Sequence, residues 1–183
     1  MSDFSCDVKE NIKRLETSLN VERNFDILQR EVVIAGRRAG FFFIDGFVQE
    51  DTVEKLIQFF YSLKESDMQS LDTFLEKGMP YTEVSRSSNI DNVITQFLSG
   101  VSIMTIDGFD ECLLIDCRTY PMRSVSEPWK DRVLRGSRDG FVETLVSNAA
   151  LLRRRIRDPR FSMELYGIGR RSRSDVAICY ISD

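Results

Sequence analysis

Histidine is absent from this sequence of 183 residues. The absence excludes every catalytic arrangement that depends on an imidazole, including Ser-His-Asp and Cys-His sites. It also excludes every zinc site with a histidine ligand. If the protein is an enzyme, it must therefore use one of the few chemistries that work without an imidazole.

Cysteines and long apolar segments are also scarce. The four cysteines are scattered, and Cys112 and Cys117 lie five positions apart in a strand-like run, so alternation places them on opposite faces and they cannot chelate together. We expect all four thiols to be reduced, as in a cytosolic protein. No window approaches the ~18–20 apolar residues of a membrane helix, and the first residues lack the apolar segment of a signal peptide. We therefore expect this chain to be soluble.

Charge of opposite sign gathers in the two parts of the chain. Residues 1–120 contain 12 basic and 21 acidic residues, a net charge of −9, whereas residues 121–183 contain 13 basic and 8 acidic residues, a net charge of +5. All but one of those 13 basic residues are arginine. Such asymmetry indicates either an anionic partner or contact between the two parts.

Hydrophobic periodicity predicts an α/β protein whose mixed sheet has helices packed on it. The expected order up to residue 120 is α-β-β-α-α-β-α-β-β, with hairpins at the Ala35–Gly40 turn and at Asp107-Gly108. The second strand of the first hairpin is apolar on both faces and should be central, whereas Tyr81–Arg86 should be an edge strand. The expected division is an N-terminal helix (1–19), a first α/β subdomain (20–120), a linker (121–138), an arginine-rich connecting helix (139–158) and a β-hairpin that starts a truncated second subdomain (159–183).

The last hairpin resembles the first, since each contains a Gly-Arg-Arg turn followed by an apolar strand. We interpret this as an internal duplication. The spacing Gly167-x-Gly169-x-x-Ser172 lies between two strands, so it indicates a hairpin turn and not a dinucleotide fingerprint. Because the second hairpin lacks sheet partners in this chain, its unpaired edges should recruit another chain, which predicts a homo-oligomer with a swapped hairpin.

A candidate anion-binding site precedes the connecting helix. Arg135, Ser137 and Arg138 lie where free backbone N–H groups and the helix dipole could hold a phosphate or a carboxylate. The alternative is an ordinary N-cap, from Ser137 or Asp139, with flanking surface charge.

The connecting helix carries a candidate interface. Its apolar stripe should dock on the first subdomain or on a neighbouring subunit, and its arginines should form salt bridges with the acidic part of the chain or with another subunit. A phosphate-rich partner and a solvated surface are the alternatives for the arginines. The predicted interface residues are Phe141, Leu145, Ala149, Leu152, Arg153, Arg154, Arg155 and Arg157.

Acidic residues at strand ends are the remaining candidates for chemistry. Asp45, Asp107, Glu111 and Asp116 could form paired carboxylates for acid/base catalysis, but aspartate is also favoured in turns for local backbone reasons. No nucleophile, base and oxyanion donor can be assembled from the sequence, and there is no phosphate-binding P-loop. We therefore predict no catalytic residues, no metal and no cofactor.

Three stretches of the sequence resemble one known family. Residues 134–181, which read LRGSRDGFVETLVSNAALLRRRIRDPRFSMELYGIGRRSRSDVAICYI, resemble a signature block of the bacterial spore germinant receptor A-subunit (GerA) family. The upstream runs CLLIDCRTYP and EVVIAGRRAGFFFIDGF match the segments that precede this block in the family. Two details, RGSRDGFVET and DVAICYI, are more similar to the stage V sporulation protein AF branch.

The resemblance implies a non-enzymatic N-terminal cytosolic domain of a membrane-embedded germination protein, on the cytoplasmic (core) side of the spore inner membrane. It further implies two α/β subdomains joined by the arginine-rich helix, other subunits of a membrane germination complex as partners, and a role in nutrient signal transduction or ion release. A domain that binds an amino acid or a sugar is the alternative. A nucleic-acid or phosphate-binding module fits less well with the acidic first part and the pI of about 5.1, so no nucleic-acid partner is predicted.

Overall fold

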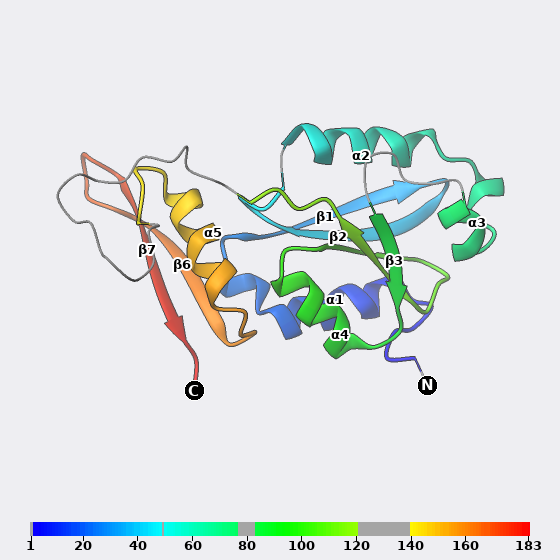
Figure 1. The fold of residues 1–183 in the computed structure, drawn as a ribbon, viewed down its shortest axis with the longest axis horizontal. Helices are drawn as coiled ribbons and strands as arrows, with labels where there is room; N and C mark the ends of the chain where they lie inside the picture. Colours follow the sequence, from blue (N-terminus) through cyan, green and yellow to red (C-terminus); the bar gives the residue numbers. More distant parts are fainter. Residues whose placement is uncertain (1, 49, 77–82, 121–139) are drawn as a thin grey trace, which may run out of the picture.

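The structure, a computed structural model, describes residues 2–48, 50–76, 83–120 and 140–183. A five-stranded sheet has helices on both faces, and a further helix with a two-stranded hairpin lies beside one end of that sheet (Figure 1). None of the described helices combines the length and the apolar character needed to cross a bilayer.

The elements follow the order that the sequence predicts. The helices are α1 (Val8–Leu19), α2 (Glu50–Ser62), α3 (Leu71–Glu76), α4 (Ile90–Leu98) and α5 (Leu145–Arg155), with short 3₁₀ helices η1 (Val21–Arg23) and η2 (Glu65–Met68). The strands are β1 (Ile27–Ile34), β2 (Arg37–Ile44), β3 (Glu83–Ser87), β4 (Ser102–Ile106), β5 (Cys112–Asp116), β6 (Phe161–Ile168) and β7 (Ser174–Ile181).

The sheet has the strand order β1-β2-β4-β5-β3. The expected α/β fold is confirmed, but all four pairings of this sheet are antiparallel, where a mixed sheet was expected. The connection from β2 to β3 returns the chain in the antiparallel direction, whereas β3 and β4 run parallel and the connection through α4 crosses over β5, which lies between them. As predicted, β2 is central and β3 is an edge strand.

The first hairpin turns more tightly than the sequence suggested. Ala35 and Gly36 alone form the turn, with φ angles of 46° and 81°, and Arg37 already pairs with Ile34. Two residues with positive φ match the twist of the flanking strands, so no longer loop is needed. The expected turn over Ala35–Gly40 was therefore too long.

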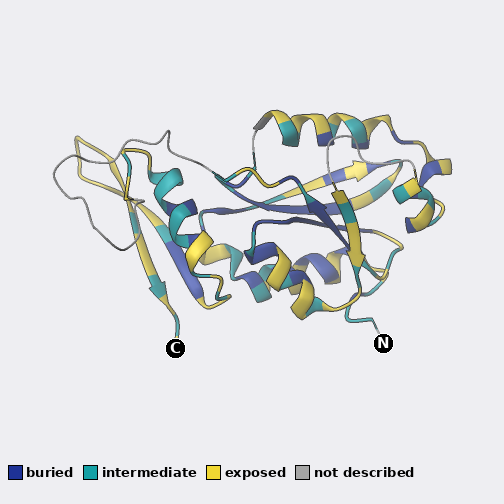
Figure 2. Cartoon of the chain, viewed as in Figure 1, coloured by how far each residue is buried: buried dark blue, intermediate teal, exposed yellow. Residues whose placement is uncertain are grey.

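Each face of the five-stranded sheet has its own core (Figure 2). Because side chains alternate along β2, Phe42 and Ile44 pack beneath α1 and α4, whereas Phe41 and Phe43 pack against α2 on the other face. Phe60 of α2 meets Phe41 edge-on, with 6.1 Å between the ring centroids. Burial on both faces explains why β2 reads as a continuous apolar run.

Gly40 lets α1 approach the sheet closely. A Cβ atom at this position would lie 2.5 Å from Cγ1 of Ile12 in α1, which is closer than packed atoms tolerate. A side chain here would therefore push α1 away from β2.

The cysteines behave as the alternation predicted. Cys112 packs in the core beneath α1, Cys117 packs in the core on the opposite face, and all four thiols are free. Burial raises the pKa of both thiols, so they are poor nucleophiles.

The connecting helix begins later than the sequence predicted. Thr144 is its N-cap, so Gly140–Glu143 is not helical, and the expected caps at Ser137 and Asp139 lie outside the described residues. Phe141, expected in the apolar stripe, therefore precedes the helix and is 66% exposed. The third hairpin forms as predicted, with all eight residue pairs of β6 and β7 in register.

Candidate functional site

Arg153 is the most buried arginine of the helix, with 0% of its surface exposed. It lies in the last turn of α5 and reaches toward the connection between η1 and β1. Its guanidinium donates to three partners in two parts of the chain: to the Asp26 carboxylate and the Asn24 side chain before β1, and to the backbone carbonyl of Phe161 in β6. We call these residues, with Asn20 and Ser162, the Arg153 junction.

The ion pair between Arg153 and Asp26 is bidentate. Nε lies 2.8 Å from Oδ2 and Nη2 lies 2.9 Å from Oδ1, and each side chain is only 1% exposed. The backbone carbonyl of Asp26 also accepts the N–H of Asp45 at 2.7 Å, which fixes its position at the start of β1. Two parallel hydrogen bonds define the orientation of both groups, which a single point contact would not do.

Asn24 uses its whole side-chain amide. Its Oδ1 accepts hydrogen bonds from Nη2 of Arg153 at 2.7 Å and from the backbone N–H of Met163 at 2.9 Å. Its Nδ2 donates to the carbonyls of Leu19 and Asn20, at 3.1 and 3.0 Å. This one side chain therefore ties the end of α1 to both α5 and β6.

Backbone contacts extend the junction along β6. Asn24 and Met163 form a parallel bridge, and the N–H of Phe25 donates to the carbonyl of Met163 at 3.0 Å. Asn20 has a left-handed backbone φ of 50°, and its side-chain amide donates to the hydroxyl of Ser162 at 3.0 Å. The edge of β6, expected to be unpaired, is thus partly occupied by the chain that leads into β1.

Apolar contacts complete the junction. The Arg153 guanidinium lies over the ring of Phe161, 4.9 Å from its centroid. Phe161 and Met163 pack with Ala149 of α5 in a small separate cluster, whereas Ala150 packs into the core beneath α1. Gly46 makes room for that contact, because a Cβ there would lie 3.1 Å from the Cβ of Ala150. Helix α5 therefore contacts the sheet with one side and the hairpin with another.

The geometry suits mechanical coupling and offers no reactive group. The side chains of Arg153, Asp26 and Asn24 are buried, and they are hydrogen-bonded to one another. Among the residues that the structure describes, no three histidine, cysteine, aspartate or glutamate side chains gather as metal ligands would. The junction can hold the hairpin, α5 and β1 in one fixed arrangement.

Comparison with known proteins identifies the family. The family model described as the Bacillus/Clostridium GerA spore germination protein matches residues 13–183. The chain belongs to the GerA family. The family predicted from the sequence is thereby confirmed, and the Arg153 junction lies entirely within the matched range.

Three relatives illustrate the extent of the similarity. Stage V sporulation protein AF of Bacillus subtilis (strain 168) is 31% identical over 176 residues, covering 95% of this chain and 36% of that protein. The uncharacterized membrane protein YfkQ of the same organism is 27% identical over 181 residues, covering 97% and 35%. The crystal structure of the N-terminal domain of the A subunit of the Bacillus megaterium spore germinant receptor GerK3 superposes with a TM-score of 0.75 at 22% identity, covering 99% of this chain and 66% of that one. This GerA chain thus spans about a third of the length of the two curated relatives.

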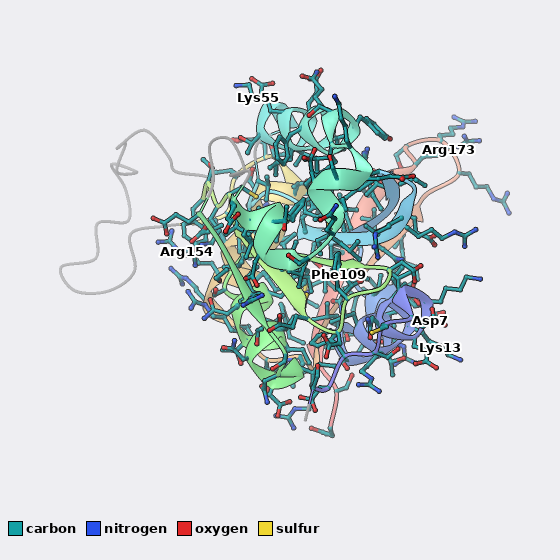
Figure 3. The ribbon with its side chains drawn as sticks, turned by 90° about the vertical axis from the view of Figure 1, so that its right-hand side faces the viewer. Asp7, Lys13, Lys55, Phe109, Arg154 and Arg173 are labelled. Atoms are coloured by element: carbon teal, nitrogen blue, oxygen red, sulfur yellow. The ribbon has the colours of Figure 1, made fainter. Side chains whose placement is uncertain are left out.

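The structure separates the predicted interface arginines. Arg153 forms the ion pair with the acidic part of the same chain that the sequence favoured, and it faces no external partner. Arg154, labelled in Figure 3, instead stacks on Tyr120, with 4.4 Å between its Cζ and the ring centroid. Arg157 donates from Nε to the carbonyl of Arg154 at 3.3 Å. Only one of the four predicted interface arginines is therefore part of the junction.

The other predicted site residues have separate positions. Ala149 packs with Phe161 and Met163 of the hairpin, where docking on the first subdomain or on another subunit was expected, and Leu152 packs at the edge of the same cluster. Leu145 is half-buried at the start of α5. Arg155 and Phe141 line a shallow concavity beside α5. The candidate anion site of Arg135, Ser137 and Arg138 lies outside the described residues.

The acidic residues at strand ends serve local structure. Asp107 accepts the N–H of Val8 at the start of α1, and Glu111 pairs with Arg86 at 3.4 Å. Asp116 forms a bidentate pair with Arg118, and the hydrogen bonds from that guanidinium lower the pKa of the carboxyl group. Each of these three acids thus has a local structural partner.

Sequence reasoning missed Asn24 and Asp26, which hold the junction together. A signal was present, because both alternate with Phe25 and Ile27 and so occupy the same face of an extended segment. Two polar residues on one face, directly before the buried start of a strand, predict a polar partner elsewhere in the chain. The sequence does not say that this partner is Arg153, 127 residues from Asp26.

Proposed function

We propose that this chain is a non-enzymatic sensor or assembly domain of a spore germination protein. It acts on the cytoplasmic (core) side of the spore inner membrane and contributes to nutrient signal transduction or to ion release during germination. Its partners are other subunits of a membrane germination complex. This proposal adds a role and a cellular location to membership of the GerA family.

The relatives support a place in a membrane protein of the spore. A spore germinant receptor A subunit shares the fold, one relative is a stage V sporulation protein and another is described as a membrane protein. Since this chain covers about a third of the curated relatives, a membrane-embedded remainder fits their greater length.

The Arg153 junction carries the proposal. A sensor or assembly domain must pass a displacement at one surface to another part of the molecule. Helix α5 contacts the core of the sheet through Ala150 and the hairpin through Ala149, and Arg153 fixes both contacts with buried, directional hydrogen bonds. A force on the hairpin is therefore transmitted to β1 and α1 without a flexible connection.

The hairpin supplies a surface for a second copy of the chain. Away from its tip, its exposed face carries Tyr166 and Ile178, and β7 has no strand partner on its outer edge among the described residues. We propose that two copies associate there by strand addition or exchange. Static light scattering should give a mass that rises above the 21.2 kDa of one chain with concentration. A constant monomer mass at all concentrations would contradict this association.

Germination of spores tests the proposed function. In the organism of origin, we expect deletion of the full-length gene to slow the loss of spore refractility after nutrient addition. We expect Arg153→Lys to have a similar effect at normal protein abundance, because lysine keeps the charge but cannot form the planar fork with Asp26. Immunoblots of spore membranes measure the abundance.

Arg157→Lys is the matched control, since Arg157 is exposed and lies in the same segment. It should germinate as the parent does. Normal germination and normal ion release after deletion of the gene would contradict the function. A slow deletion strain combined with a normal Arg153→Lys strain would contradict only the coupling role of the junction.

A further inference from the structure

The loop Gly169–Arg173 at the tip of the hairpin is a strongly basic surface. All three basic residues of 161–183, Arg170, Arg171 and Arg173, lie in it and are exposed. The tip projects from the end of the hairpin that lies farthest from the Arg153 junction (Figure 1), and Arg173 points away from the rest of the molecule (Figure 3).

The loop has a defined conformation. The N–H of Arg173 donates to the carbonyl of Gly169 at 3.3 Å, and the hydroxyl of Ser172 donates to the carbonyl of Ile168 at 3.4 Å. Gly169 and Arg173 both have positive φ, at 94° and 46°, which closes the five-residue turn. The three guanidinium groups are thus displayed on a fixed loop rather than on a flexible tail.

These arginines differ from the partnered arginines elsewhere in the chain. Arg153 and Arg118 have carboxylate partners, and Arg154 lies on an aromatic ring. Within the residues that the structure describes, no carboxylate pairs with a guanidinium of the tip loop. Three unpaired guanidinium groups on one short loop attract anions and cost no existing contact when they bind.

Because the rest of the chain is negatively charged, only the tip loop should attract an anionic surface. The net charge is −4, so the residues outside the loop together carry −7. A chain of that charge is repelled by an anionic surface unless the basic loop leads the approach. Any binding to such a surface should therefore depend on the tip and should fix one orientation.

Apolar side chains flank the basic loop. Ile168 at the end of β6 and Val176 near the start of β7 are 52% and 38% exposed. Guanidinium groups beside exposed aliphatic side chains suit the boundary of a bilayer, where phosphates meet hydrocarbon. A nucleic acid would favour aromatic stacking within the loop, and the loop has no aromatic residue.

We propose that the tip loop binds the anionic headgroups of a lipid bilayer and orients the domain on it. The inference rests on the proposed membrane setting only for its physiological context, because lipid binding by the chain can be measured alone. The probes are vesicles of equal parts phosphatidylcholine and phosphatidylglycerol, with pure phosphatidylcholine vesicles for comparison. Flotation at low and at physiological salt measures the bound fraction.

Each arginine near an anionic bilayer strengthens binding about fivefold, so replacing all three with glutamine should weaken it more than 100-fold. The matched control replaces three exposed arginines elsewhere, Arg14, Arg30 and Arg38, and changes the net charge equally. The control should lose far less binding than the tip variant, because the replaced arginines lie away from the tip. Thermal melting should be the same for all three proteins, because the altered side chains make no buried contact.

Four results would overturn the proposal. They are equal loss of binding in the two triple variants, equal binding to both kinds of vesicle, displacement by inorganic phosphate at the concentration of accessible lipid, and tighter binding to a single-stranded oligonucleotide than to the vesicles. None of these results bears on germination, so a failure here leaves the proposed function standing. Conversely, a germination phenotype without vesicle binding would refute the lipid contact alone.

Discussion

The α/β subdomain and the unit formed by α5 and the hairpin are stabilised in different ways. The subdomain buries both faces of its sheet under helices, and its buried residues are almost all apolar. The α5–hairpin unit has a cluster of only three buried apolar residues, Ala149, Phe161 and Met163, and no residue of β7 is buried. Apolar burial gives the first region its stability, and directional polar contacts give the second its position.

The difference has an energetic meaning. Removing Arg153 and Asp26 from water costs several kcal/mol per ion, and the bidentate pair offsets that cost only while both partners are present. Such a pair contributes more to a unique arrangement than to net stability. The Arg153–Asp26 pair thus holds the hairpin in one orientation, and the loss of either partner should release it.

Arg153→Met tests this contrast most strongly. The variant keeps a long side chain but leaves the Asp26 carboxylate buried without its partner, so we expect a loss of about 3–5 kcal/mol in the free energy of unfolding. Urea denaturation followed by circular dichroism measures the loss. Arg157→Gln, at an exposed position, should change stability by less than about 0.5 kcal/mol.

A second replacement separates the cost of an unpaired charge from misfolding. Asp26→Leu combined with Arg153→Met removes both charges, and we expect it to recover a large part of the lost stability. If Arg153→Met alone were as stable as the parent, the ion pair would not hold the unit in place.

Phe161→Ala tests the small apolar cluster of the hairpin. We expect a loss of about 3 kcal/mol, because the ring is 3% exposed and lies beneath the Arg153 guanidinium. Phe141→Ala is the comparison, since Phe141 is 66% exposed and should cost less than about 1 kcal/mol. The order of the two melting temperatures decides the outcome, and a larger effect at Phe141 would restore its expected place in the docking stripe.

Glycine positions provide a smaller test of the same contrast. Gly40→Ala should cost about 1–3 kcal/mol, because the new Cβ would overlap Ile12 and displace α1. Gly167→Ala, in β6, meets no atom within 4 Å and should be neutral or slightly stabilising. Thermal melting of the two variants compares packing at Gly40, between α1 and β2, with packing at Gly167 in the hairpin. Equal shifts in melting temperature would contradict the difference in packing.

The pH dependence of the Asp116–Arg118 pair is the smallest expected effect. Its carboxyl pKa is lowered in the folded state, so the pair contributes stability above the usual carboxyl pKa of about 4 and loses it as the pH falls through the folded pKa. Because both side chains are about a third exposed, Asp116→Asn should cost no more than about 0.5 kcal/mol at neutral pH. The difference in melting temperature from the parent should shrink toward zero in acid. A difference that grows in acid would contradict the assignment.

Local sequence signals predict the strands and hairpins of this fold well. The Asp107-Gly108 pair marks the turn between β4 and β5, and the two-sided apolar run of β2 marks a central strand. These features depend on neighbours in the sequence or on simple alternation. The late start of α5 does not follow from the sequence, because Gly140 and the residues after it can serve either a helix or an extended entry.

The Arg153 junction could not be predicted from such local signals. In the sequence, Arg153, Arg154 and Arg155 are equivalent members of one basic run at the end of a helix. Their separate environments depend on how far α5 rotates toward β1, which is fixed by Ala150 against Gly46 and by Asp26. A contact between residues 26 and 153 is a property of the packed chain, and a single sequence carries no direct trace of it.

The hydrogen bonds of Asn24 also bear on the chemical lifetime of the domain. Asparagine deamidates when the backbone nitrogen of the next residue attacks the side-chain amide carbon and ammonia leaves. Here that nitrogen, of Phe25, is held by the carbonyl of Met163, and the Asn24 amide is buried and fully hydrogen-bonded. The reacting groups are thus kept apart in the folded chain. The fold thereby protects the central asparagine of the junction against spontaneous deamidation.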